Sequence, residues 1–108
     1  GLKRVMLANH GGDHTVYPDC RPEFISAMSQ AMETGTDTHV GIWAPFTSLT
    51  KGQIAAIGKE LGIDYSLTYS CYKGGKVHCG TCATCIERRE ALLYAGIFDN
   101  TVYEKDMQ

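Results

Sequence analysis

The chain has 108 residues, of which 44% are hydrophobic and 20% charged, and its formal net charge is −2. This length fits one modest domain or part of a larger one, and the slightly negative charge gives no electrostatic case for binding nucleic acid or an acidic membrane. No apolar run approaches the roughly 20 residues of a membrane span, and residues 1–4 lead into only a short apolar run, unlike a signal peptide. Five cysteines without a secretory signal indicate a reducing compartment, so we expect a cytoplasmic protein.

The first half of the chain alternates strand and helix patterns. The apolar run over residues 4–9 ends at a glycine pair, which predicts a buried strand entering a turn. A helix is expected to start near Pro22, with Asp19 or Cys20 as its cap, and to be stopped by Gly35. Residues 38–44 are a second strand candidate that ends before a proline.

The second half continues this alternation. We expect a helix capped by Thr50 and ending near Gly62, a short extended piece over residues 65–69, and a last helix that starts within a cysteine-rich run and ends before Gly96. The alternation predicts an α/β layer with a parallel sheet. Because two or three strands are too few to cover both faces of such a sheet, we infer a piece of a longer protein or a chain that assembles with partners.

Four cysteines stand close together as C-x7-C-x2-C-x2-C: Cys71, Cys79, Cys82 and Cys85. Four thiols are the ligand set of one tetrahedral zinc ion, and a closed sphere of this kind leaves no position for catalysis. The last two lie three residues apart at an expected helix start, where free N–H groups stabilise thiolates. Gly80 lets the backbone turn tightly around the ion. The spacing therefore predicts one structural Zn²⁺.

An iron–sulfur cluster is the main chemical alternative, because C-x2-C-x2-C is also a ferredoxin-like run. Against it, Arg89 stands where the ferredoxin spacing has a fourth cysteine. His78 could replace a cysteine as a ligand, but we expect it to be a surface histidine beside the site. We expect Arg88 and Arg89 to be exposed, unless one of them offsets thiolate charge. Cys20 has no base visible in the sequence and is expected to be an inert free thiol.

Three separated motifs stand in order along residues 5–103. They read Tyr17-Pro18-Asp19-Cys20-Arg21-Pro22-Glu23-Phe24-Ile25, then Ala44-Pro45-Phe46 with Leu49-Thr50-Lys51, then Ser70-Cys71-Tyr72 with the three further cysteines. Together they resemble the C-terminal half of the 7-cyano-7-deazaguanine (preQ0) synthase family of the queuosine pathway. The resemblance implies a partial Rossmann-like, adenine nucleotide alpha-hydrolase-like α/β layer, followed by a zinc-binding loop and helix.

The resemblance also implies an activity and a division of the chain. In the family, a ligase converts 7-carboxy-7-deazaguanine, ammonia and ATP, with Mg²⁺, to preQ0: the carboxylate is adenylated, ammonia forms an amide, and a second activation drives dehydration to the nitrile. The family's zinc ligands fall on the four clustered cysteines. Residues 1–70 would be the C-terminal part of the Rossmann-like domain, residues 71–104 the zinc-binding loop and helix, and residues 105–108 a tail.

One family feature is missing from this sequence. The family carries a Ser-Gly-Gly-x-Asp-Ser loop that cradles the ATP phosphates, and the segment His10-Gly11-Gly12-Asp13-His14 mimics it without either serine. We therefore expect a C-terminal portion that is inactive alone and whose partner is the missing N-terminal half. Sheet edges and faces left by that half suggest self-association, for instance as a homodimer.

Three residues are candidates for substrate binding. Asp19 and Arg21 lie just past a strand end, where α/β folds place ligands, and can pair with a guanine-like amine and a carboxylate respectively. The alternatives are a helix cap for Asp19 and a surface salt bridge for Arg21. Lys51 follows a helix cap and can reach a phosphate, or is simply solvated. Asp13 and Tyr17 are weaker candidates, and no catalytic residue is assigned.

Two other functions stay open. A related ATP pyrophosphatase that modifies a nucleobase in RNA predicts an iron–sulfur cluster and a basic surface, and the negative net charge argues against such a surface. A non-catalytic zinc-binding interaction module predicts a stable monomer, but it would not need the α/β layer upstream of the cysteines.

Overall fold

The computed structural model describes residues 1–105, and residues 106–108 of the expected tail lie outside the described residues. The chain divides into two compact units, Gly1–Thr50 and Lys51–Gln108. None of the described helices is both long and apolar enough to cross a membrane.

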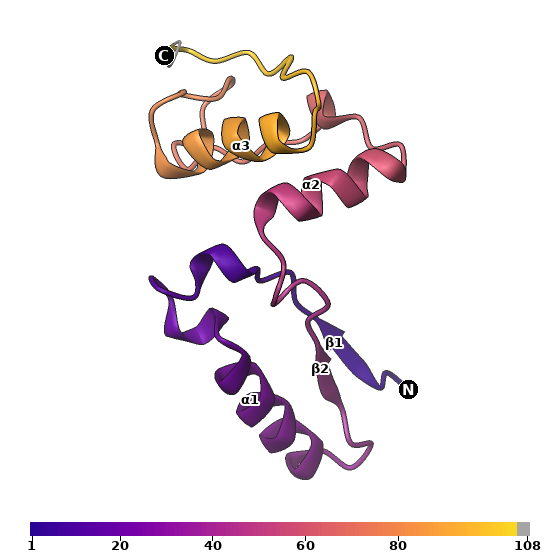
Figure 1. The fold of residues 1–108 in the computed structure, drawn as a ribbon. Helices are drawn as coiled ribbons and strands as arrows, with labels where there is room; N and C mark the ends of the chain where they lie inside the picture. Colours follow the sequence, from indigo (N-terminus) through magenta and orange to yellow (C-terminus); the bar gives the residue numbers. More distant parts are fainter. Residues whose placement is uncertain (106–108) are drawn as a thin grey trace. The chain divides into compact units, whose positions relative to one another are not determined.

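The first unit is a β–α–β arrangement (Figure 1). The strands β1 (Arg4–Met6) and β2 (Gly41–Trp43) pair in parallel. Two 3-10 turns, η1 (Gly11–Asp13) and η2 (Pro18–Cys20), lead into α1 (Pro22–Gly35), which packs against β2. This confirms the predicted α/β layer with parallel strands.

Two details of this unit differ from the prediction. The strand expected to be buried is exposed: Val5 and Met6 keep 45% and 58% of their surface, because two strands leave the sheet without covering layers. Neither Asp19 nor Cys20 caps α1, since both lie within η2. The N-cap is Arg21, which makes no side-chain capping bond.

The second unit is built around two helices and the loops that flank them. The helix α2 (Lys51–Glu60) begins directly after Thr50 and packs against α3 (Ala83–Tyr94). The N-cap of α3 is Cys82, which confirms a helix that starts within the cysteine run. The segment predicted to be extended is instead a 3-10 turn, η3 (Tyr65–Leu67), because the Asp64 side chain accepts the Ser66 N–H at 3.0 Å.

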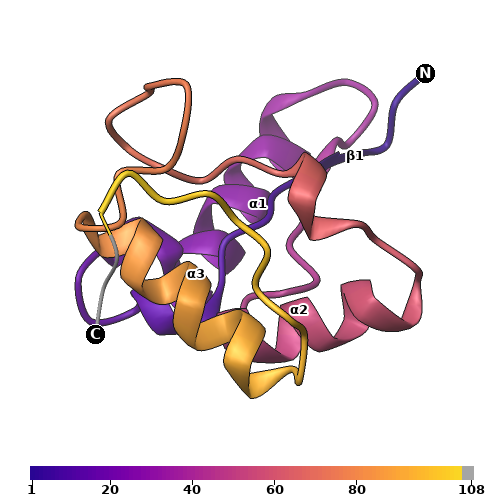
Figure 2. The same ribbon diagram turned by 90° about the horizontal axis from the view of Figure 1, so that it is seen from above.

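After α3 the chain turns back and runs along this helix, as Figure 1 and Figure 2 show. The Thr101 N–H donates to the Asp99 carboxylate at 3.0 Å and closes the turn. The Glu104 N–H then donates to His78 O at 2.7 Å, and the Lys105 N–H donates to Cys79 O at 3.1 Å. These bonds tie the end of the described chain to the cysteine loop.

The core of the second unit consists largely of cysteine. Cys71, Cys79 and Cys85 are 6%, 3% and 0% exposed, and Cys82 and Tyr103 pack against them. The other buried hydrophobic residues of this unit, within the described range, are Ala55, Ala91 and Leu92. A core this small needs a further source of stability, and in small domains a structural metal commonly supplies it.

Candidate metal centre

Four thiols converge between the loop that follows η3 and the first turn of α3. The sulfur atoms of Cys71, Cys79, Cys82 and Cys85 all lie within 4.8 Å of one another. The Cys79–Cys85 and Cys71–Cys82 sulfur pairs are 3.9 Å and 4.0 Å apart, and all four are free thiols. A tetrahedron with Zn–S bonds of about 2.3 Å has sulfur–sulfur edges of about 3.8 Å. The cluster therefore has the size and the donor chemistry of a four-thiolate zinc site.

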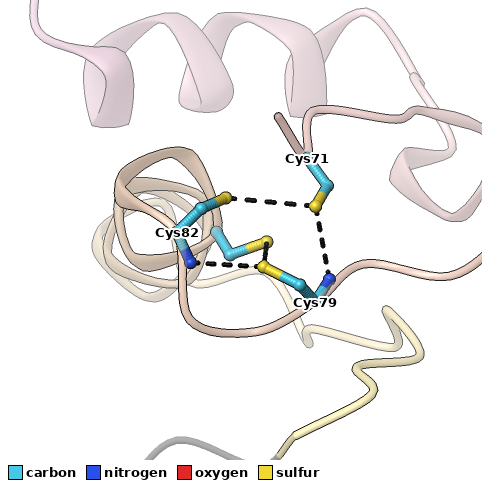
Figure 3. Close-up of side chains that lie close together, drawn as sticks. Cys71, Cys79 and Cys82 are labelled. Carbon is cyan, nitrogen blue, oxygen red and sulfur yellow. Dashed lines mark hydrogen bonds between the residues drawn. The ribbon is translucent and has the colours of Figure 1, made fainter. Parts of the chain in front are cut away.

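Backbone N–H groups point at two of these sulfur atoms (Figure 3). The N–H groups of Thr81 and Cys82 donate to Cys79 Sγ at 3.3 Å and 3.2 Å. Those of Lys73 and Cys79 donate to Cys71 Sγ at 3.4 Å and 3.3 Å. Such donors stabilise a thiolate more than a thiol, so the local backbone favours the form that binds metal.

Gly80 makes the turn between Cys79 and Cys82 possible. Its φ is +81°, in the left-handed region that other residues rarely adopt. A Cβ at this position would also overlap the Lys105 carbonyl oxygen and lie 3.3 Å from Tyr103 Cβ. The prediction that Gly80 lets the chain turn tightly is confirmed, and the C-terminal segment uses the space that its missing side chain leaves.

The thiols differ in acidity. Hydrogen bonding, first of all with the Thr84 hydroxyl, lowers the pKa of Cys82 to about 5. The Thr81 hydroxyl, followed by the Thr81 N–H, lowers the pKa of Cys79 to about 7. Burial raises the pKa of Cys85 to about 12. Cys85 therefore keeps its proton at neutral pH until a cation compensates the charge, which couples metal binding to proton release.

His78 is 6% exposed and is not the surface histidine that the sequence predicts. Its Nε2 accepts the Ser70 N–H at 3.1 Å, and its ring lies against Tyr69 and Tyr103. Burial lowers the pKa of His78, which keeps the ring neutral and able to accept this bond. His78 thus fixes the residue before Cys71 and does not take the place of a thiol.

The two arginines predicted to be exposed are also partly or fully buried. Arg89 is half-buried, with its guanidinium 4.2 Å from the centre of the Tyr103 ring. Arg88 is only 7% exposed. It donates four hydrogen bonds: to Tyr65 O at 2.7 Å, Thr68 Oγ1 at 3.0 Å, Ser70 Oγ at 3.3 Å and Thr101 Oγ1 at 2.9 Å.

Arg88 is the residue that sequence reasoning missed. It links α3 to the segment that leads into Cys71 and to the segment that returns along the helix. The available signal was its position three residues after Cys85, which places both on one face of the helix. Burying a guanidinium requires that most of its donors be satisfied, and these partners satisfy them.

The predicted substrate-binding residues lie outside the cysteine cluster. Asp19 is exposed in η2, and Arg21 is half-buried with its Nε donating to His14 O at 2.7 Å. Lys51 belongs to the second unit, where its Nζ lies 2.7 Å from Glu87 Oε2. Asp19 and Arg21 thus share one unit and Lys51 begins the other. Their role in substrate binding stays a prediction.

The segment His10–His14, which mimics a phosphate loop in sequence, makes hydrogen bonds and an ion pair among its own residues. His10 Nε2 lies 3.1 Å from Asp13 Oδ2, and the Gly12 N–H donates to His10 Nδ1 at 3.1 Å. Nearby, partial burial and the Asp19 and Asp13 carboxylates raise the pKa of Cys20. A raised pKa makes a poor nucleophile, in line with the expectation for this thiol.

We predict that zinc binding to the cluster strengthens as pH rises. Because the pKa of Cys85 is raised, its proton must leave on binding, and Cys79 contributes a second proton below its pKa of about 7. The slope of log affinity against pH should be about one or more near pH ~8 and steeper below pH ~7. Thr81→Val, which removes a hydroxyl bond to Cys79, should move the steep region to higher pH.

Competition with a chromophoric chelator, corrected for the chelator's own protonation, measures these slopes. An affinity that does not change with pH would contradict the assignment of a protonated, buried Cys85.

We also predict that Arg88→Lys lowers the free energy of unfolding of the metal-loaded chain by about 2–4 kcal/mol. Lysine keeps the charge but cannot reproduce the planar set of donors, and each lost bond from a charged group is worth about 1.5–3 kcal/mol before partial replacement. Glu90→Gln, at an exposed position of the same helix, is the control and should change stability by less than about 0.5 kcal/mol. Denaturant titration compares the two, and equal midpoints would rule out a clamping role for Arg88.

Comparisons with known proteins place the chain in a family. Residues 1–96 match the family model described as "Queuosine biosynthesis protein QueC". The chain is 60% identical over 104 residues to the 7-cyano-7-deazaguanine synthase of Porphyromonas gingivalis strain W83, which covers 96% of this chain and 47% of that protein. It is 50% identical over 99 residues to the 7-cyano-7-deazaguanine synthase of Desulfotalea psychrophila, covering 92% of this chain and 45% of that protein.

The 7-cyano-7-deazaguanine synthase of Marinobacter nauticus is 47% identical over 105 residues, covering 97% of this chain and 48% of that protein. No solved structure matches the chain significantly. The chain spans about half the length of the curated relatives it matches. Because the family model covers most of the sequence, the chain belongs to the family of the queuosine biosynthesis protein QueC.

Proposed function

We propose that this chain is the C-terminal portion of an ATP-dependent ligase that converts 7-carboxy-7-deazaguanine and ammonia to 7-cyano-7-deazaguanine in queuosine biosynthesis, in the cytoplasm. The observation that carries the proposal is the 60% identity, over nearly the whole chain, to a protein named 7-cyano-7-deazaguanine synthase. An identity this high over 96% of the chain supports a shared function as well as a shared fold.

The metal in this proposal is a structural Zn²⁺ held by Cys71, Cys79, Cys82 and Cys85. Four thiolates complete a tetrahedral sphere and leave no position for substrate or water, so the ion would stabilise the fold and take no part in the reaction. The burial of the thiols supports this role, since Cys85 is fully inaccessible. The cluster would join residues 71–104 into one zinc-binding loop and helix.

The remaining residues would complete a Rossmann-like domain together with a missing N-terminal half. Residues 1–70 would supply the last part of its α/β layer, and the exposure of β1 and of Trp43 on β2 supports the need for further strands and helices. ATP and Mg²⁺ would bind to the other half, because this sequence has no Ser-Gly-Gly-x-Asp-Ser loop. The chain alone would therefore be inactive. Unpaired sheet edges also favour self-association.

Substrate recognition would fall partly on this chain. The bond from Arg21 Nε to His14 O fixes the guanidinium and leaves its terminal nitrogens free to grip a carboxylate. Asp19, exposed on the adjoining turn, has the acceptor atoms that a guanine-like edge requires. Lys51 would contact a phosphate only after leaving Glu87, with which it forms a half-buried ion pair.

A chimera tests this proposal. Fusing the chain behind the N-terminal half of the Porphyromonas gingivalis relative should give a protein that forms the nitrile from 7-carboxy-7-deazaguanine and ammonia only when ATP is present. The chain alone should form none. Mass spectrometry of the product and circular dichroism of both proteins give the readouts.

The activity of the chimera must be compared with a measurement of its folding and metal content. A chimera that is folded and metal-loaded, and yet yields no nitrile, would overturn the proposed function. Nitrile formation by the chain alone would overturn the narrower statement that this half is inactive.

A further inference from the structure

The side chain of Asn9 occupies a defined position at the end of β1. Its Nδ2 donates to Cys20 O at 3.1 Å and to Thr47 Oγ1 at 3.3 Å. The Thr47 hydroxyl donates to Ala44 O at 2.9 Å, so it acts as an acceptor toward Asn9. Both partners of Nδ2 are therefore acceptors, and turning the amide over would set Oδ1 against these two acceptor oxygens. The orientation of the Asn9 amide is thus determined by its partners.

This orientation leaves Asn9 Oδ1 in an unusual state. The atom is buried and has no hydrogen-bond partner among the described residues. A buried acceptor without a donor destabilises the fold, and in native proteins such atoms usually mark a water or a ligand. His14 Nε2, on the same loop, is likewise buried without a partner in the described part of the chain. Asn9 Oδ1 and His14 Nε2 are therefore two buried polar atoms in the segment after β1 whose hydrogen bonding is unsatisfied within the described residues.

The place of Asn9 in the fold favours a ligand. Parallel strands end at the same edge of a sheet, and α/β proteins bind their ligands in the crevice beyond that edge. Asn9 follows β1, and Thr47 follows β2. The two loops are joined by the Asn9–Thr47 bond and by the Gly11 N–H, which donates to Leu49 O at 2.7 Å. A Cβ at Gly11 would lie 3.2 Å from that oxygen, so the close approach depends on glycine.

We propose that Asn9 Oδ1 accepts a hydrogen bond from an N–H group of the bound 7-deazapurine, and that Asn9 thereby determines specificity for a ring that carries such donors. This inference rests on the proposed function, which supplies the class of ligand. A 7-deazaguanine ring bears donor N–H groups on its ring and its amine, and its carboxylate would remain for Arg21. A fixed, buried acceptor discriminates strongly against a ring without the donor, because the acceptor would be left unpaired.

Binding of 7-carboxy-7-deazaguanine to the full-length chimera tests the inference by calorimetry. Asn9→Leu, which keeps the shape of the side chain but no polar atom, should weaken binding about 10- to 100-fold. Thr47→Val is the comparison variant, because it removes one of the two bonds that hold the Asn9 amide while Cys20 O still orients it. It should weaken binding clearly less than Asn9→Leu does. An equal loss in both variants would mean that Asn9 only holds the two loops together, and would overturn the inference.

A second measurement does not depend on how Asn9→Leu folds. The side-chain amide signal of Asn9 in the parent protein, assigned by through-bond NMR, should shift on saturation with the ligand, because a hydrogen bond at Oδ1 polarises the amide. If other signals saturate while this one stays, a water satisfies Oδ1 and the inference fails alone. If no signal moves at all, the ligand does not bind, and the proposed function fails together with the inference.

Discussion

The convergence of four thiols is the constraint on which the second unit depends. Cys71 comes from a segment fixed by Arg88 and His78, Cys79 and Cys82 come from a turn that Gly80 makes possible, and Cys85 lies in α3. Few apolar side chains are buried in this unit, so the sulfur atoms fill the place of a hydrophobic core. A metal that neutralises their charge would join these three segments, and its binding free energy would become folding free energy.

The two units differ in how they expose their polar and reactive side chains. Three of the four clustered thiols in the second unit are buried, and with Cys82 they would stabilise the fold by binding a metal. In the first unit β1 is exposed, and the segment between β1 and α1 carries several polar and charged side chains.

The sequence was most informative where local chemistry decides the structure. The cysteine spacing predicted the cluster, and the start of α3 within that spacing is confirmed. Prediction from the sequence failed where residues distant along the chain determine burial. Arg88 is buried because Tyr65 and Thr101 supply its hydrogen-bond acceptors. The exposure of β1 was missed because its apolar run alone was interpreted as a buried strand, although so few strands cannot cover both faces of a sheet. Residues 65–69 failed for a local reason, the capping bond of Asp64.

The identity of the bound metal shows whether the four cysteines form a structural zinc site. Elemental analysis of the chain purified without oxygen, with a visible absorption spectrum of the same sample, separates a structural four-thiolate site from a redox cluster. We expect about one zinc per chain and a colourless solution, since four thiolates complete the coordination of a single zinc ion. Iron with a brown charge-transfer band would contradict it, and would make the cysteines part of the chemistry.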